Sequence, residues 1–409
     1  MSRFDTSVLA HHSDDRTRIL GWLDAALKAI DPVTLTRDAI AASGIGSASV
    51  IAIGKAAPAM VRGVADATTL VGGVCISDHV EEVPASVRLL IGDHPIPLAG
   101  SYAAAGAALR EAETAPREQP LIGLISGGGS SLCEAPKQGV SADYVRTVYE
   151  TLIRGGANID EINLVRGHLS AIKCGGLARA AQRPIDTYVI SDVAGADPGI
   201  IASGPTVPRD LEPEAARAVM ERFGIEVTPD IWNAMGREYE TIPKPKITLL
   251  ADGHDAAQAV ARATPFESMV RSEWLNGDIT TCLDKFFDRA ATTVSIAVGE
   301  PVLEVTEPGR GGRATHAALL AAQLIAGSDA VFVAFATDGV DGRSGAAGAI
   351  VDGWTIARGG DPIPALGRFD SGEYLERTGD LLICDPTGTN VSDIWILWRR
   401  SEGGAQAAT

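Results

Sequence analysis

Uninterrupted apolar runs alternate along this chain with segments whose apolar residues recur at helical spacing. The run at residues 121–125 predicts a strand buried on both faces, and runs of the same kind occur at 48–54, 187–191 and 330–336. Apolar spacing predicts helices between these strands, at residues 15–30, 101–113, 142–154, 213–223, 255–263 and 314–326. Regular alternation of strands and helices predicts an α/β protein.

The loop that follows the strand at 121–125 has the composition of an anion-binding turn. Glycines let backbone N–H groups converge on one point, and hydroxyl groups add donors without charge. A tight turn that binds nothing would have the same composition, but other predicted strands also end in polar residues. The loop residues are Ser126, Gly127, Gly128, Gly129, Ser130 and Ser131.

Three more predicted strands end beside chemically useful side chains: Lys55, Asp192 and Asp338. Because the carboxyl ends of parallel strands share one edge of a sheet, we expect these residues and the loop to meet around a ligand. A phosphate-binding loop, a lysine, aspartates that can hold Mg²⁺ and Arg313 at a helix start suit phosphoryl transfer. Taken singly, Lys55 also fits a solvated helix start, and the aspartates fit a helix cap or a turn.

A dense polar cluster lies at residues 163–173, with Asn163, Arg166, His168, Ser170 and Lys173. It is too polar for an ordinary core helix, although a solvated helix face is the simpler interpretation. No residue set indicates a nucleophile paired with a base.

Composition narrows the function further. The chain has 409 residues, enough for two domains, and the segment Pro243-Lys-Pro-Lys246 predicts a boundary near residue 242. A net charge of −17 argues against a nucleic-acid or anionic-membrane partner. Five cysteines without C-x-x-C spacing, no leader and no long apolar run predict a soluble cytoplasmic protein.

Two common nucleotide-binding motifs are missing from the sequence. The loop at 126–131 continues into Leu132 and Cys133 rather than Lys-Ser or Lys-Thr, so it is not a Walker A loop. Gly44-Ile-Gly46 precedes a predicted strand instead of following one, which argues against a dinucleotide-dependent reductase. These observations favour a kinase with a different nucleotide site.

Several short motifs occur in a fixed order across nearly the whole chain. They are Ile53-Gly-Lys-Ala-Ala57, Asp93-His-Pro95, Leu124-Ile-Ser-Gly-Gly-Gly-Ser-Ser-Leu132, Asn163-Leu-Val-Arg166 with His168-Leu-Ser170 and Lys173, Ser191-Asp-Val193, Ile201-Ala-Ser-Gly-Pro-Thr206, Gly311-Gly-Arg313, Thr337-Asp-Gly339 with Asp341-Gly342, Thr378-Gly-Asp-Leu-Leu382 and Thr387-Gly-Thr-Asn-Val391. This set resembles the type-2 glycerate kinases, the MOFRL-domain family whose members are often called hydroxypyruvate reductases.

The resemblance implies a fold and an activity. It implies a Rossmann-like parallel-sheet domain at 1–241 and a smaller carboxyl-terminal α/β domain of MOFRL type at 242–409, which together enclose a cleft. The implied activity is phosphorylation of D-glycerate to 2-phosphoglycerate, with ATP and Mg²⁺ as cofactors. The implied partners are a small sugar acid and a nucleotide, and the resemblance is compatible with a homodimer.

The resemblance also implies residue roles. Lys55 and Arg313 would hold the substrate carboxylate and the charge of the transferred phosphoryl group, and Asp192 would be the base or orienting group. The loop at 126–131 and Lys173 would bind the nucleotide. Substrate contacts are assigned to Asn163, Arg166 and Glu300, and Mg²⁺ contacts to Asp338 and Asp341.

The chain departs from the family pattern at several positions: Gly167, Cys174, Ala196, Ala314, His316 and Cys384-Asp385. Several of them flank the implied cleft, so a longer aldonate is an alternative acceptor. Two further alternatives are an NAD(P)H-dependent hydroxypyruvate reductase and a non-catalytic sensor of the same fold.

Overall fold

The computed structural model describes residues 3–5, 14–209, 212–236, 245–290, 292–307 and 309–400. The chain divides into two compact units: Pro32–Leu250, here called the amino-terminal unit, and Met1–Asp31 with Ala251–Thr409, here called the carboxyl-terminal unit. The first helix thus belongs with the carboxyl-terminal unit. The predicted boundary near residue 242 lies outside the described residues, and the division into 1–241 and 242–409 stays a prediction.

The amino-terminal unit is built on a six-stranded sheet in the order β4-β3-β2-β5-β6-β7. The pairs β2/β3, β2/β5, β3/β4 and β5/β6 are all parallel, so these five strands end at one edge. Every residue of β5 is buried, as its apolar run predicts. The strands are β2 (Ser47–Ile53), β3 (Thr69–Ser77), β4 (Val87–Ile91), β5 (Leu121–Ile125), β6 (Asp186–Ile190) and β7 (Lys246–Ala251).

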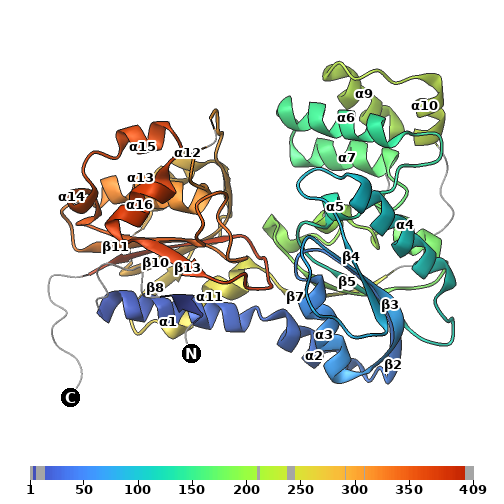
Figure 1. Cartoon of the computed structure of the whole chain (residues 1–409), viewed down its shortest axis with the longest axis horizontal. Coiled ribbons are helices and arrows are strands. Elements are labelled where there is room, and N and C mark those ends of the chain that lie inside the picture. Colours follow the sequence, from blue (N-terminus) through green and yellow to red (C-terminus); the bar gives the residue numbers. More distant parts are fainter. Residues whose placement is uncertain are drawn as a thin grey trace. The chain divides into compact units, whose positions relative to one another are not determined.

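Helices cover this sheet and form the core with it. Alanines of α4 (Ala99–Thr114) and residues of α8 (Gly176–Ala181) pack with Ile53, Ile76 and Ile125 in one buried cluster. Helix α3 (Ala57–Ala67) contacts β2 and β3, and it also packs against α2 (Pro32–Ser43). The expected parallel α/β fold is confirmed for this unit (Figure 1).

Four further helices form a second cluster within the amino-terminal unit, drawn in green in Figure 1. Their shared core includes Tyr149, Leu152, Val165 and Met220. The polar segment at 163–173 therefore begins on a helix whose other face is apolar. The helices are α6 (Ala142–Arg154), α7 (Ile159–Leu169), α9 (Pro213–Arg222) and α10 (Pro229–Met235).

The carboxyl-terminal unit has its own sheet, in the order β1-β13-β12-β11-β14-β10-β8, with β9 also paired to β10. Strand β11 is antiparallel to both neighbours, whereas β8 and β9 run parallel to β10. The strands are β1 (Phe4–Asp5), β8 (Ser268–Val270), β9 (Leu275–Asp278), β10 (Val294–Val302), β11 (Ala330–Ala336), β12 (Gly348–Asp352), β13 (Leu381–Cys384) and β14 (Asp393–Arg399).

One prediction about shared edges is wrong. The sequence placed Asp338 at the same sheet edge as Lys55, the glycine loop and Asp192, but β11 belongs to the other, mostly antiparallel sheet. An apolar run predicts a buried strand without identifying its pairing partners, and this run pairs with strands that come later in the chain.

Helices pack on both faces of the carboxyl-terminal sheet, as Figure 1 shows. Helices α12 and α13 enclose Phe332 and Trp395 in the main core, while Trp22 of α1 meets Trp398 of β14. No helix among the described residues is long and apolar enough to cross a bilayer. The helices are α1 (Asp14–Ala29), α11 (Gly253–Ala263), α12 (Ile279–Asp288), α13 (Arg313–Leu324), α14 (Thr355–Gly359), α15 (Ile363–Gly367) and α16 (Ser371–Thr378).

Candidate active site

Three predicted site elements lie at the carboxyl edge of the parallel sheet: Lys55 after β2, Ser126 after β5 and Asp192 after β6. Backbone bonds join the first two turns. The Lys55 amide donates to the Gly127 carbonyl at 2.9 Å, and the Ala56 amide donates to Ser126 Oγ at 3.1 Å. The lysine and the glycine loop are thus fixed relative to each other.

Two glycines make this close approach possible. A Cβ atom on Gly54 would lie 2.2 Å from Ser126 Oγ and 2.5 Å from the Ser126 carbonyl oxygen, so any side chain would separate the turns. Gly128 has a φ of +81°, and a Cβ there would lie 3.2 Å from Lys55 Cγ and 3.7 Å from His94 Cδ2. The Lys55 side chain therefore passes next to the bare backbone of Gly128, and His94 reaches the same place.

Asp78 and His79 follow β3 at the same edge, and the sequence reasoning missed both. Strands β2 and β3 pair Ile53 with Ile76, and the Gly54 amide continues the ladder to the Ile76 carbonyl at 3.1 Å. This register places Asp78 next to Lys55. The signal was available, because Asp78 directly follows Ser77, the last residue of β3, whose end carries the short apolar run Val74-Cys-Ile76.

Asp78 is held in place by its neighbour. His79 Nδ1 lies 2.7 Å from Asp78 Oδ1, and His79 Nε2 lies 3.3 Å from Glu81 Oε2. Burial alone would raise the Asp78 pKa, but the hydrogen bond with His79 and the charge of Lys55 outweigh it and lower that pKa. Asp78 is therefore an ionised carboxylate at neutral pH.

Lys173 lies beneath the glycine loop and is almost fully buried. Its ammonium donates to the Ser130 carbonyl at 2.7 Å and to the Cys133 carbonyl at 3.3 Å, and it lies 2.8 Å from Glu134 Oε2. Three partners match the three protons of an ammonium group. In this arrangement Lys173 supports the loop from below, and its predicted contact with the nucleotide stays a prediction.

Glu134, which the sequence reasoning also missed, completes this buried pair. Its Oε2 accepts a second hydrogen bond from the Tyr149 hydroxyl at 2.8 Å, and burial raises the pKa of that phenol. Arg166 stacks over the Tyr149 ring, with the guanidinium carbon 5.0 Å from the ring centroid. Arg166, a predicted substrate residue, thus contacts Tyr149, which in turn bonds to the buried pair beneath the loop.

Asn163 reaches the loop through a serine. Ser130 Oγ lies 2.8 Å from Ser203 Oγ, and the Ser203 hydroxyl donates to Asn163 Oδ1 at 3.0 Å. Asn163 Nδ2 is buried and has no hydrogen-bond partner among the described residues. A buried donor without an acceptor costs free energy, so this amide fits a site for an anionic ligand next to the loop.

The carboxyl-terminal unit contains the other predicted site residues. Arg313, the first residue of α13, forms ion pairs with Glu300 of β10 and with Asp393, the latter at 3.3 Å. Asp393 is fully buried, and burial raises its pKa to about 7 although Arg313 opposes this shift. The structure therefore brings Arg313 and Glu300 together, and their predicted roles at the substrate stay a prediction.

Asp341 is a helix cap in this structure. Its two carboxylate oxygens accept hydrogen bonds from the backbone amides of Ala314 and Thr315, each at 2.8 Å. Asp338 Oδ1 accepts from the Val340 amide at 3.0 Å within its own turn. Each Asp341 oxygen still has a lone pair available, and the predicted Mg²⁺ contacts of Asp338 and Asp341 stay a prediction. The described residues contain no group of three or more side chains that could hold a metal ion by themselves.

Known protein families and relatives match this chain over most of its length. Residues 18–236 match a domain of unknown function, DUF4147, and residues 293–393 match the MOFRL family. This chain belongs to the MOFRL family. A D-glycerate 2-kinase of Thermotoga maritima is 32% identical, with 91% of this chain and 95% of the relative covered. A glycerate 2-kinase of Pyrococcus horikoshii is also 32% identical, with 93% and 96% covered.

Structure agrees with sequence on the MOFRL assignment. The crystal structure of the Thermotoga maritima glycerate kinase gives a TM-score of 0.82 at 29% identity, covering 94% of this chain and 99% of the other. A relative in Agrobacterium vitis, 34% identical with 91% of both chains covered, carries the provisional name hydroxypyruvate reductase. The predicted family, two-sheet α/β fold and kinase class are confirmed, and such an enzyme takes its phosphoryl group from a nucleotide.

Two departures from the MOFRL-family pattern occupy left-handed backbone positions. Cys174 stands where the pattern has glycine and has a φ of +49°, and Ala196 stands where it has aspartate and has a φ of +48°. Glycine and aspartate adopt this conformation more readily than cysteine or alanine. Cys174 and Ala196 therefore hold a backbone conformation that residues of their type rarely adopt.

Proposed function

We propose that this protein is an ATP-dependent D-glycerate 2-kinase that requires Mg²⁺ and produces 2-phosphoglycerate and ADP. The observation that carries the proposal is the glycine loop joined to the Lys55 turn, with Asp192 following the next strand, at one sheet edge of a MOFRL-family chain. This arrangement supplies an anion-binding backbone, a cation and a carboxylate, which are the parts that phosphoryl transfer needs.

The nucleotide phosphates would lie against the loop at 126–131. The half-buried Gly128 has no side chain to keep a phosphate at a distance, and Asn163 Nδ2 supplies a buried donor without a partner among the described residues. Lys55, which passes next to Gly128, would neutralise charge on the transferred group. Any Mg²⁺ would be bound mainly through the nucleotide phosphates, with Asp338 and Asp341 as the proposed protein contacts, because the two helix-cap hydrogen bonds of Asp341 leave lone pairs on its oxygens.

Asp192 would accept the proton of the attacking 2-hydroxyl group. As that oxygen bonds to the γ-phosphorus, the bond between this phosphorus and the bridging oxygen breaks, and ADP leaves with the electron pair. Arg313 would bind the glycerate carboxylate, with Glu300 and Asp393 orienting the guanidinium. In this proposal Lys173 positions the loop, and residues 1–241 and 242–409 are the two functional domains.

A direct assay tests the proposal. The purified chain is incubated with ATP, Mg²⁺ and sugar acids of three to six carbons, ADP release is measured, and NMR identifies the phosphorylated hydroxyl. Lys55→Ala should lower kcat on the order of 10²-fold or more. Lys28→Ala, an exposed lysine on α1, is the matched control and should retain full activity.

Each alternative predicts a different result. A longer aldonate kinase would release ADP only with the larger acids, and a hydroxypyruvate reductase would oxidise NADH or NADPH. Nucleotide binding without turnover of any acid would indicate a sensor. Absence of ADP release with every acid would refute the kinase proposal.

A further inference from the structure

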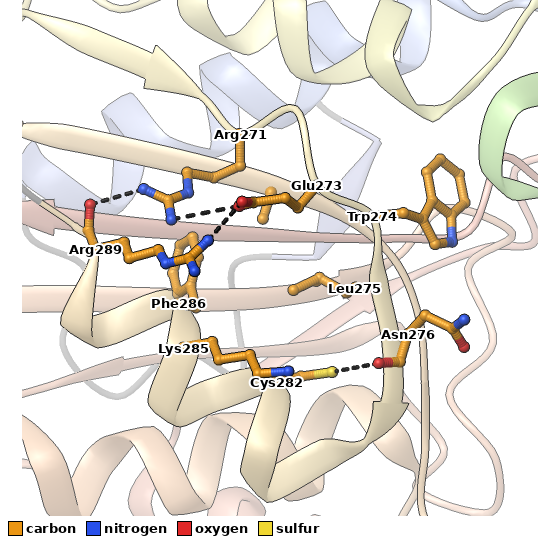
Figure 2. A pocket seen from close by; sticks show the side chains of 10 residues that line it. Arg271, Glu273, Trp274, Leu275, Asn276, Cys282, Lys285, Phe286 and Arg289 are labelled. Atoms are coloured by element: carbon orange, nitrogen blue, oxygen red, sulfur yellow. Dashed lines mark hydrogen bonds and ion pairs between the residues drawn. The ribbon is translucent and has the colours of Figure 1, made fainter.

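A cavity of about 300 Å³ lies in the carboxyl-terminal unit, between the β8–β9 loop, helix α12 and strand β10 (Figure 2). None of the predicted catalytic or substrate residues lines it. Its lining contains Arg271, Lys285 and Arg289 but only one acidic residue, Glu273. Three cations against one carboxylate give a local net charge of +2, within a chain whose net charge is −17.

The positive charges come from two different elements and converge. Lys285 and Arg289 are four residues apart at the end of α12, so they share one helix face, where like charges repel. Arg271 arrives from the end of β8, and its Nη1 donates to the Arg289 carbonyl at 2.7 Å. Through this bond Arg271 also meets the negative end of the α12 dipole, which favours all three cations beside the cavity.

Glu273 already shows how an anion fits this position. Arg289 contacts one of its carboxylate oxygens, and Arg271 Nη2 lies 3.6 Å from the other, as the dashed lines in Figure 2 show. Both Glu273 and Arg289 are exposed, with 63% and 57% of their side-chain surface accessible. Ion pairs this exposed contribute about 0–1 kcal/mol, so a ligand anion can replace Glu273 at little cost.

Apart from these charged residues and Asn276, the lining is mainly apolar. Leu275, Phe286 and Ala297 are buried beneath it, and Trp274 stands at the side opposite the two arginines (Figure 2). A volume of about 300 Å³ is at the lower limit of small-molecule sites, which excludes a whole nucleotide. The cavity therefore matches a short ligand with an anionic end and an apolar body.

We propose that this cavity binds a small organic anion, a carboxylate or phosphate monoester that carries an apolar group. The anion would bridge Arg271 and Arg289 in place of Glu273, with Lys285 as a third contact, and the apolar group would lie against Phe286 and Trp274. This inference is independent of the kinase proposal, because it rests on binding and on residues outside the proposed catalytic set.

Calorimetry on the full-length protein tests it, with phenyl phosphate as the probe and inorganic phosphate and benzyl alcohol as the partial probes. Phenyl phosphate should bind more tightly than either partial probe. Arg289→Gln and Lys285→Gln should each weaken it by about tenfold, a change of about 1.4 kcal/mol. Glu273→Gln should tighten it, because the competing carboxylate is gone. Arg262→Gln, an exposed arginine on α11, is the matched control and should leave binding unchanged.

The opposite signs expected for Glu273→Gln and Arg289→Gln separate a ligand site from a structural ion pair, since loss of a purely structural pair would not tighten binding. Circular dichroism would confirm that each variant is folded. Three results would overturn the proposal: no binding of phenyl phosphate at millimolar concentration, equal binding of inorganic phosphate, or an affinity that Arg289→Gln leaves unchanged. An affinity unchanged in Arg289→Gln would also be the result if phenyl phosphate bound at the proposed kinase site instead of this cavity.

Discussion

The buried pair beneath the glycine loop gives the sharpest prediction. The Glu134 and Lys173 side chains are 0% and 1% exposed, so Glu134→Gln leaves an ammonium in the core without its counter-charge. Breaking one partner of a buried pair costs about 3–5 kcal/mol. We expect a cost of about 3 kcal/mol, the lower end, because Lys173 keeps its bonds to two carbonyls and a glutamine can still accept from Tyr149.

Hydrogen exchange measured by mass spectrometry is the suitable assay, because the two units can unfold separately. Amides of β5 and the loop after it should lose roughly 100-fold of their protection, which corresponds to about 3 kcal/mol. Glu221→Gln, which removes an exposed partner of Arg217 on α9, should change protection by less than about threefold.

A double variant separates charge burial from simple packing. Glu134→Gln combined with Lys173→Met removes both buried charges, and the glutamine can still accept from Tyr149, so the double variant should recover part of the lost protection. The reasoning is refuted if Glu134→Gln exchanges like the wild type. It is also refuted if the double variant is less protected than Glu134→Gln.

Three other carboxylates yield predictions. Asp341→Ala removes the acceptor of two amides at the start of α13 and should lower the free energy of unfolding by about 2 kcal/mol in urea titrations, whereas an unchanged midpoint would rule out the capping role. Asp393 has a folded pKa of about 7 against an ordinary 3.8, so the folded state holds its proton between these pH values. The free energy of unfolding of the wild type should therefore fall as the pH rises from about 4 to 7. Tm measured over this range should fall less in Asp393→Asn, and parallel curves of Tm against pH in the two proteins would contradict the raised pKa of Asp393. Asp78→Asn should lower kcat about tenfold with little change in KM, because the Lys55 ammonium loses the negative charge of a neighbouring carboxylate. Asp78→Glu should retain more activity, and equal rates in all three proteins would exclude a positioning role.

Local sequence signals predicted much of the amino-terminal unit. The apolar run of β5 is buried at every position, and helix α6 has the predicted bounds, because apolar periodicity and a serine cap agree there. Lys55, the glycine loop and Asp192 were predicted to share an edge, and parallel pairing brings their strands together. This shared edge could be predicted because each of these strands is followed in the sequence by a turn and a helix, which is the order that parallel strands require.

Pairings between distant residues could not be predicted in the same way. The family resemblance implied that Lys173 binds the nucleotide, but its contacts with Glu134 and with two carbonyls of another segment could not be read from the sequence. Asp338 follows a strand as predicted, but its strand has antiparallel partners from the other sheet. Such contacts depend on tertiary packing, which has no signature in local periodicity.

The ion pairs of Arg313 suggest how a glycerate carboxylate would reach that residue in the proposed enzyme. Arg313 has two carboxylate partners of unequal exposure, with Glu300 at 51% and Asp393 at 2%. Water weakens the exposed pair, whereas the buried Asp393 keeps a fixed position behind the guanidinium. An incoming carboxylate would therefore compete with Glu300 alone, and Asp393 would keep Arg313 oriented throughout the exchange. In the proposed enzyme, the exposed Glu300 would thus be the partner that is exchanged, and the buried Asp393 the partner that remains.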